Sequence, residues 1–141
     1  MDVMSSEELR AIELLSRVRY GVLVTSLRAM PVLVPARHVL ADGRVLLRLQ
    51  ATGDGVRAGC GSVVAYGADN LNSGSAALWS VQFTGTAETV RPTDEELARF
   101  GPRPQRVDGE NFRPAYLCVE PHFATLHTLH DSAGHSAQHA E

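Results

Sequence analysis

The sequence predicts a mainly β protein, a closed and mostly antiparallel β-barrel of six to seven strands with short helices. It contains six or seven short runs rich in valine and leucine, several of which alternate apolar and polar residues as half-buried strands do. Only two or three segments have helical spacing, and all of them are short. Strands and helices do not alternate regularly, which favours a barrel over a doubly wound parallel sheet.

The N-terminal segment predicts a short amphipathic helix. Ser5-Ser6-Glu7-Glu8 fits a capping box, in which the serine oxygen and the glutamate carboxylate satisfy free backbone amides at the start of a helix. The apolar residues that follow recur at helical spacing, so one stripe should pack against the body of the domain: Leu9, Ile12, Leu15 and Val18.

Three strands should follow this helix. We expect the first two at residues 20–27 and 30–40, because valine and leucine dominate there and polar residues interrupt them once, where a hairpin can turn. Asp42-Gly43 then reverses the chain. The third strand, residues 44–51, alternates so that one face carries Arg44, Leu46, Arg48 and Gln50 and the other carries Val45, Leu47, Leu49 and Ala51.

Two further strands are predicted after a glycine-rich turn and a short helical turn, residues 52–59. The fourth strand spans residues 62–69 and the fifth spans residues 78–90. Gly85 marks a bulge in the long fifth strand. One face of that strand should be buried, and it carries Trp79, Val81 and Phe83.

The last third of the chain should contain one short helix and the end of the barrel. A second capping box at residues 93–96 begins the helix, and Gly101 ends it. Residues 102–113 form a polar surface loop, and residues 115–121 and 123–129 give one or two closing strands. The predicted organisation is one barrel domain, residues 1–130, and a flexible C-terminal tail, residues 131–141.

Composition limits the partners of the chain. Its 141 residues carry a net charge of -3, so it lacks the cationic field needed to wrap nucleic acid or coat an anionic membrane. The sequence shows no signal-peptide pattern, and no apolar run approaches the roughly 20 residues of a membrane span. Cys60 and Cys118 lie far apart and fit ordinary reduced thiols. We therefore expect a cytoplasmic protein.

Cations accumulate in and after the predicted second and third strands, although the chain as a whole is acidic. Arg48 and Gln50 project from one face of the third strand, and the glycine-rich turn that ends at Arg57 follows directly. Exposed amides of such a turn, a helix N-terminus and an arginine fork all suit a phosphate group. The alternative is that Arg48 and Arg57 are solvated residues without a ligand. In either case we expect both side chains at the surface.

The order of the elements resembles that of a known family. The helix, the hairpin, the strand that ends in RLQATGDGVR and the strand that reads WSVQFTGTA are similar to the pyridoxamine 5'-phosphate oxidase-like, FMN-binding split barrels, over residues 5–129. The resemblance implies a split barrel that binds FMN at the interface of a homodimer. It matches Thr52 to the threonine of the family's phosphate turn and Arg57 to its lysine, whereas Val56 replaces a hydroxyl residue.

The resemblance also implies which residues contact the cofactor. In the family the second strand runs beside the isoalloxazine ring, where a cation and backbone amides stabilise the negative charge of the reduced flavin. The alternatives are a packed strand histidine for His38 and core or dimer-seam packing for Trp79, with Ser80 and Gln82 approaching the cofactor from the other subunit. The predicted cofactor-binding residues are Pro35, Ala36, Arg37, His38, Arg48, Gln50, Thr52, Arg57, Trp79 and Gln82.

Histidines form a second cluster near the C-terminus. Their spacings of three to five residues could suit zinc or one axial haem ligand. No cysteine or carboxylate pattern accompanies them, so we predict no functional metal. The five histidines are His122, His127, His130, His135 and His139.

These features predict a cytoplasmic, homodimeric flavoprotein that binds FMN. It would be an oxidoreductase that passes hydride or electrons between the flavin and a small-molecule substrate. Two alternatives stay open: a reductase of the same fold that uses the deazaflavin F420, and a non-catalytic module that binds flavin or haem. The sequence does not identify the substrate or a catalytic residue.

Overall fold

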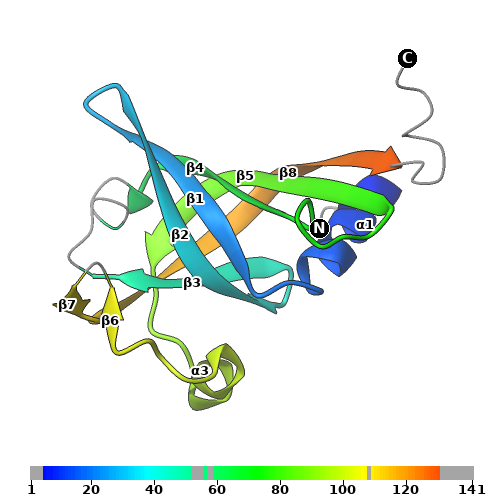
Figure 1. Cartoon of the computed structure of the whole chain (residues 1–141). Helices are drawn as coiled ribbons and strands as arrows, with labels where there is room; N and C mark the ends of the chain where they lie inside the picture. The colour runs from blue at the N-terminus through cyan, green and yellow to red at the C-terminus, as the bar shows by residue number, and fades with distance from the viewer. Residues whose placement is uncertain (1–4, 52–55, 57–58, 108, 131–141) are drawn as a thin grey trace.

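The structure is a computed structural model that describes residues 5–51, 56, 59–107 and 109–130. Its six long strands form a closed antiparallel barrel in the order β1-β2-β3-β8-β5-β4 (Figure 1). The predicted mainly β split barrel is therefore confirmed. The elements are α1 (Ser6–Leu15), β1 (Tyr20–Leu27), β2 (Met30–Ala41), β3 (Arg44–Gln50), β4 (Val63–Asp69), β5 (Ala77–Thr89), α3 (Asp94–Phe100), β6 (Arg106–Val107), β7 (Glu110–Asn111) and β8 (Pro114–His130).

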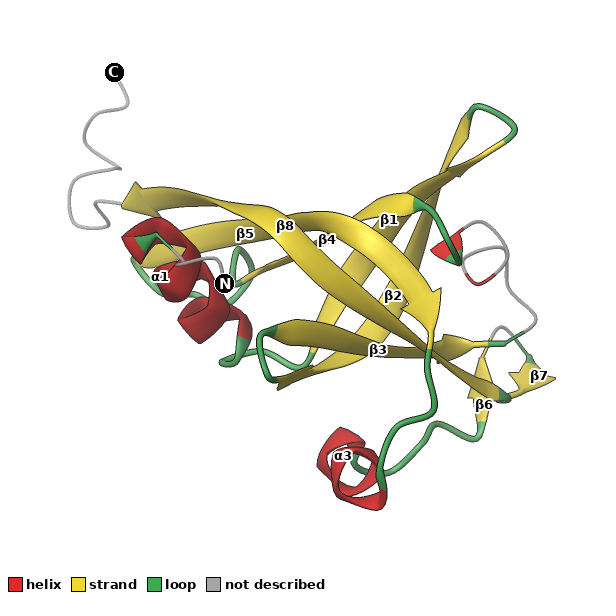
Figure 2. Cartoon of the chain, turned by 180° about the vertical axis from the view of Figure 1, so that it is seen from behind, coloured by secondary structure: helices red, strands yellow, loops and turns green. Residues whose placement is uncertain are grey.

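Helix α1 begins at the predicted capping box and packs against β5 and β8 (Figure 2). Its predicted stripe is partly wrong, because Leu9 is 57% exposed. The buried positions are Ala11, Leu14 and Leu15, which follow the i, i+3, i+4 spacing of one helix face, and Leu9 precedes that face by two residues. Neither helix has the length and apolar character needed to cross a bilayer, as far as the described residues go.

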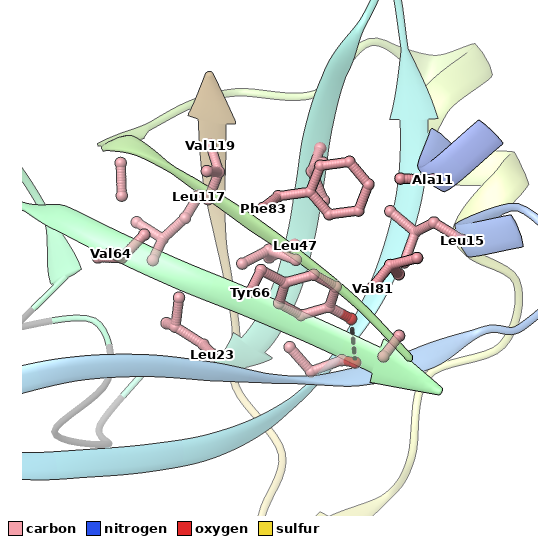
Figure 3. Packing of buried hydrophobic residues seen from close by; sticks show 14 of the residues in the cluster. Ala11, Leu15, Leu23, Leu47, Val64, Tyr66, Val81, Phe83, Leu117 and Val119 are labelled. Atoms are coloured by element: carbon pink, nitrogen blue, oxygen red, sulfur yellow. Dashed lines mark hydrogen bonds between the residues drawn. The ribbon is translucent and has the colours of Figure 1, made fainter. Parts of the chain in front are cut away.

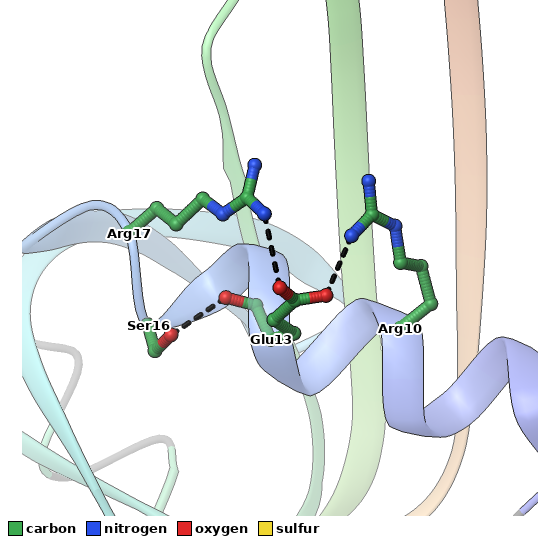
Figure 4. Close-up of polar contacts among 4 residues, drawn as sticks. All are labelled: Arg10, Glu13, Ser16 and Arg17. Atoms are coloured by element: carbon green, nitrogen blue, oxygen red, sulfur yellow. Dashed lines mark hydrogen bonds and ion pairs between the residues drawn. The ribbon is translucent and has the colours of Figure 1, made fainter.

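The outer surface of α1 carries a small ionic cluster (Figure 4). Glu13 lies between two arginines, with its carboxylate 2.5 Å from Arg10 and 3.0 Å from Arg17. The Ser16 hydroxyl donates to the Glu13 backbone carbonyl. The hydrogen bonds from Arg10 and Arg17 lower the pKa of Glu13. All four residues are exposed, so water and salt screen these pairs and they add little to stability.

The barrel interior is filled by apolar side chains from all six strands and from α1 (Figure 3). Tyr66 of β4 and Phe83 of β5 are among its largest fully buried members. The inward face of β5 is the one predicted. The pairing register shifts at Gly85, but the bulge lies in the partner strand: Thr84 pairs with Phe123 and Gly85 with Pro121, so the extra residue is His122 of β8. Gly85 has to be glycine, because a Cβ atom at this position would lie 1.9 Å from the Glu120 carbonyl oxygen.

A second apolar cluster lies on the outer side of the barrel, beneath α3. Phe100 at the end of α3 packs there with Val39 of β2, Leu46 of β3 and Cys118 of β8. Both faces of β3 are therefore covered, although its alternation of polar and apolar residues is that of a half-buried strand. The physical reason is that α3, which is distant in sequence, provides a cover for the outer face of β3.

The connection from α3 to β8 contains a short hairpin, β6–β7, where the sequence predicted only a polar loop. Val107 pairs with Glu110 across this hairpin, and Gly109 adopts a positive φ of 81° that suits glycine in the turn. β8 then runs without interruption as one closing strand. The predicted flexible tail, residues 131–141, lies outside the described residues.

Candidate functional site

A pocket of about 580 Å³ opens on the outer side of the barrel, between β2, the end of β3 and the segment that carries β6 and β7. This volume lies in the range of small-molecule sites. The strands provide a continuous wall, and the β6–β7 segment provides the facing wall. The lining residues are Tyr20, Val32, Leu33, Val34, Pro35, Ala36, Arg37, Arg48, Leu49, Gln50, Pro104, Val107, Glu110 and Phe112.

Half of the predicted cofactor-binding residues line this pocket. The second-strand segment that the family resemblance placed beside a flavin ring forms much of its wall, and the end of the third strand adjoins it. The structure therefore brings together residues from two strands and joins them to a hairpin about sixty positions later. The predicted residues that line the pocket are Pro35, Ala36, Arg37, Arg48 and Gln50.

Arg48 is buried, at 4% exposure, and the expectation that its side chain lies at the surface is wrong. Its Nη1 donates to the Gly101 carbonyl at 3.0 Å, and its Nη2 donates to the carbonyls of Phe100 at 3.3 Å and Pro102 at 3.0 Å. The guanidinium also lies over the Phe100 ring, 5.2 Å from its centroid. Arg48 thus holds the C-terminal end of α3 against the barrel.

Arg37 lies directly opposite Arg48 across the β2–β3 pair and contacts the same helix end. Its Nε donates to the Phe100 carbonyl at 3.1 Å, and its Nη2 donates to the Arg99 carbonyl at 3.0 Å. Two adjacent cations are tolerated here because both face the carbonyls and the negative dipole end of a helix. Burial lowers the pKa of Arg37, with further lowering from the nearby Arg19.

Gln50 of β3 holds the end of the β6–β7 hairpin and the segment that follows it, at the end of the pocket away from α3. Its Nε2 donates to the Asn111 carbonyl at 3.2 Å, and its Oε1 accepts from the Arg113 amide at 2.7 Å. The Ala51 amide also donates to the Arg113 carbonyl at 2.7 Å. The polar side chains predicted to hold a cofactor are thus largely engaged in holding the wall of the pocket in place.

His38 points into the barrel and does not line the pocket. It is 2% exposed, and its Nε2–H donates to the Leu15 carbonyl at 3.0 Å, while its Nδ1 lies 2.6 Å from the Tyr66 hydroxyl. That hydroxyl is also 3.1 Å from the Ala36 carbonyl oxygen. Burial lowers the pKa of His38 and raises that of Tyr66. The geometry matches the packed strand histidine, the alternative interpretation of His38.

The remaining predicted site residues lie apart from the pocket or outside the described residues. Trp79 is 8% exposed and belongs to the barrel core, as one of its two interpretations expected. Gln82 is exposed on β5, opposite Gly67 of β4, and does not line the pocket. Thr52 and Arg57 fall outside the described residues, so the phosphate turn stays a prediction.

The histidine cluster and the cysteines show no metal site in the part of the chain that the structure describes. His122, His127 and His130 all lie on β8 and are exposed, whereas His135 and His139 are outside the described residues. Cys60 and Cys118 are free thiols in different environments. These are the reduced cysteines that their spacing predicts.

Several pocket residues were missed by sequence reasoning. The apolar wall at residues 32–34 was predicted as strand and not as site, and Val107, Glu110 and Phe112 were assigned to a polar surface loop. The signal that could have found them is the glycine at residue 109, which permits a tight hairpin inside that loop. No local pattern indicates that the hairpin folds back onto β3.

The fold defines the class of protein, a split β-barrel, and in this chain a pocket opens on the outer side of the barrel. The chain belongs to the pyridoxamine 5'-phosphate oxidase family, whose model matches residues 7–128. It is 36% identical over 104 residues to the uncharacterised protein Rv0080 of Mycobacterium tuberculosis, a match that covers 70% of this chain and 68% of that protein.

Solved structures show the same fold. An FAD-binding protein from Mycobacterium smegmatis has a TM-score of 0.68 at 24% identity, over 89% of this chain and 98% of its own. An FAD-binding protein from Mesorhizobium loti has a TM-score of 0.63 at 14% identity, over 85% and 91% of the two chains. At these identities the similarity is one of fold.

Proposed function

We propose that this protein binds a flavin, specifically FMN, in the pocket between β2 and the β6–β7 hairpin, and acts as a cytoplasmic oxidoreductase. The observation that carries the proposal is that residues 35–37, which family resemblance puts beside an isoalloxazine ring, line a pocket of about 580 Å³. Family membership and the two FAD-binding proteins of the same fold support a flavin.

The residues of the pocket suit a planar, partly polar ring. Val32, Leu33, Val34 and Phe112 give apolar surface that excludes water from its faces. Each guanidinium has five N–H donors. Arg48 donates three hydrogen bonds to carbonyls, and Arg37 donates four, two of them to Arg19 and His38, so each arginine keeps at least one N–H group for a ligand. Those donors would interact with the ring edge and stabilise negative charge there. The flavin would supply the hydride or electron transfer itself.

We also propose that the protein is a homodimer. Strand register places Tyr20, Val22, Val63 and Phe123 on the outer side of the barrel, and all four are exposed. Exposed apolar groups on one sheet surface are typical of a protein–protein interface. Sedimentation at micromolar concentration should give twice the mass of the chain, and a monodisperse monomer would remove this proposal.

The flavin proposal is tested by spectrum and by titration. The purified protein, or its apoprotein refilled with FMN, should show the absorption of oxidised flavin. A deazaflavin spectrum would favour the F420 reductase, a haem Soret band would favour the haem module, and no uptake of any of the three would refute cofactor binding.

A matched pair of variants locates the site. Leu33 lines the pocket and is 64% exposed, so Leu33→Trp should fill the pocket without unfolding the barrel. Met30, on the same strand, is 65% exposed and does not line the pocket, so Met30→Trp is the control. We expect the first variant to lose FMN binding and the second to keep it. Equal binding by both would place the flavin elsewhere.

A further inference from the structure

Glu110 is the single acidic side chain among the described residues that line the pocket. It lies on β7 directly opposite Val107 of β6, and residues opposite each other in an antiparallel pair share one face. Both residues line the pocket, so Glu110 lies on the hairpin wall, although its side chain as a whole is exposed. Among the described residues this carboxylate has no hydrogen bond and no ion pair.

The backbone around Glu110 is fixed on both sides. The Arg106 guanidinium donates to the Gly109 carbonyl at 2.8 Å, and the Phe112 amide donates to the Gln105 carbonyl at 2.9 Å. Gln50 of β3 donates to the carbonyl of Asn111, the residue next to Glu110. The backbone that carries Glu110 is therefore anchored to the barrel, which limits the region that its carboxylate can reach.

The cations of the pocket do not neutralise Glu110. Arg48 donates to three carbonyls at the end of α3. Arg37 donates to two carbonyls there and, through Nη1, to the carbonyls of Arg19 and His38. Neither arginine forms an ion pair with Glu110 among the described residues. A ligand in the pocket would bring its own donor to Glu110, because a carboxylate covered by a ligand loses water and needs a replacement hydrogen bond. The lining of the pocket thus includes two arginines on the strands and one carboxylate on the hairpin.

We propose that Glu110 is a specificity-determining residue that selects a heterocyclic ligand with a ring N–H group. The inference rests on the proposed flavin function. In a flavin the ring N–H group is N3–H, which lies on the pyrimidine edge between two carbonyl groups. Those carbonyls are acceptors and suit the free N–H groups of the arginines. Ligands that lack this N–H group, or that carry an alkyl group on that nitrogen, should bind more weakly than the corresponding ligand with the N–H.

The test uses two probes that differ only at N3, lumiflavin, which carries a hydrogen there, and 3-methyllumiflavin, which carries a methyl group. Each is titrated into the full-length apoprotein, and binding is followed by flavin fluorescence. The wild type should bind lumiflavin about tenfold more tightly, as one charge-assisted hydrogen bond at a solvent-accessible rim predicts. Glu110→Ala should bind the two probes equally. Glu88→Gln, which changes an exposed glutamate on β5 that does not line the pocket, should keep the full discrimination.

Each result has one meaning. Equal binding of the two probes by the wild type overturns the role of Glu110 and leaves flavin binding intact. Discrimination that persists in Glu110→Ala also overturns it, because the methyl group is then rejected by other residues. Failure of the wild type to bind lumiflavin, FMN or riboflavin refutes the flavin function itself, and the proposed N–H partner with it.

Discussion

Replacing Arg48 by alanine should loosen the attachment of α3 and leave the barrel folded. The side chain is buried and donates three hydrogen bonds to backbone carbonyls. Bonds from a charged donor contribute roughly 1.5–3 kcal/mol each, but in the variant water can reach the carbonyls of Gly101 and Pro102, which are not buried. We therefore expect a net loss of about 2–3 kcal/mol in the free energy of unfolding.

The loss can be measured by urea unfolding followed through Trp79, the single tryptophan of the chain, which is buried in the core. Arg44→Ala is the matched control on the same face of β3, because among the described residues Arg44 donates a single long contact, 3.5 Å, to the Cys118 sulfur. It should cost less than about 1 kcal/mol. Equal stability of Arg48→Ala and the wild type would refute the role of Arg48 as a clamp.

Ligand binding gives a second readout that separates the clamp from a phosphate contact. If Arg48 positions the pocket wall, Arg48→Ala should weaken FMN and riboflavin by the same factor, because both carry the ring and only FMN carries the phosphate. Arg48→Lys keeps the charge and loses the fork, so it should recover little of the binding. If Arg48→Ala weakened the binding of FMN and not that of riboflavin, Arg48 would instead contact the phosphate, as its position in the sequence suggests.

Three further predictions concern other parts of the chain. Arg57→Ala should weaken FMN ten- to a hundredfold relative to riboflavin in a fluorescence titration, since one charge-assisted bond to phosphate contributes roughly 1.5–3 kcal/mol, and equal losses would contradict it. Because burial lowers the pKa of His38, folding favours its neutral form. The free energy of unfolding should therefore be highest above the unfolded-state pKa of this histidine and fall as the pH drops below it. Urea unfolding across pH 5–7.5 should show that the free energy of unfolding of His38→Gln depends less on pH than that of the wild type. Gly85→Ala should destabilise the barrel by at least about 2 kcal/mol because of the Glu120 carbonyl, whereas Gly67→Ala, whose Cβ would lie 3.6 Å from the nearest atom, should be tolerated; thermal unfolding compares them.

Local patterns predicted the elements of the barrel well. Both helices begin at the capping boxes read from the sequence, at Ser5 and Thr93, because a cap depends on residues only three positions apart. The inward face of β5 followed from period-two alternation, and Gly85 marked the position of the register shift, although the extra residue lies in β8. Of the ten predicted cofactor-binding residues, half line the pocket, whereas His38 and Trp79 are buried in the barrel; which of them contact a cofactor stays a prediction.

The sequence by itself determined which residues form strands, where they turn and which family the chain resembles, because hydrophobic periodicity and turn chemistry act over a few residues. Only the tertiary structure decided what Arg37, Arg48 and Gln50 contact. Most of their partners lie in the segment from α3 to β8, roughly fifty to sixty positions away, and no local pattern specifies such a contact. The same segment covers the outer face of β3 and builds one wall of the pocket, so side chains that alternation marks as solvent-facing become buried anchors.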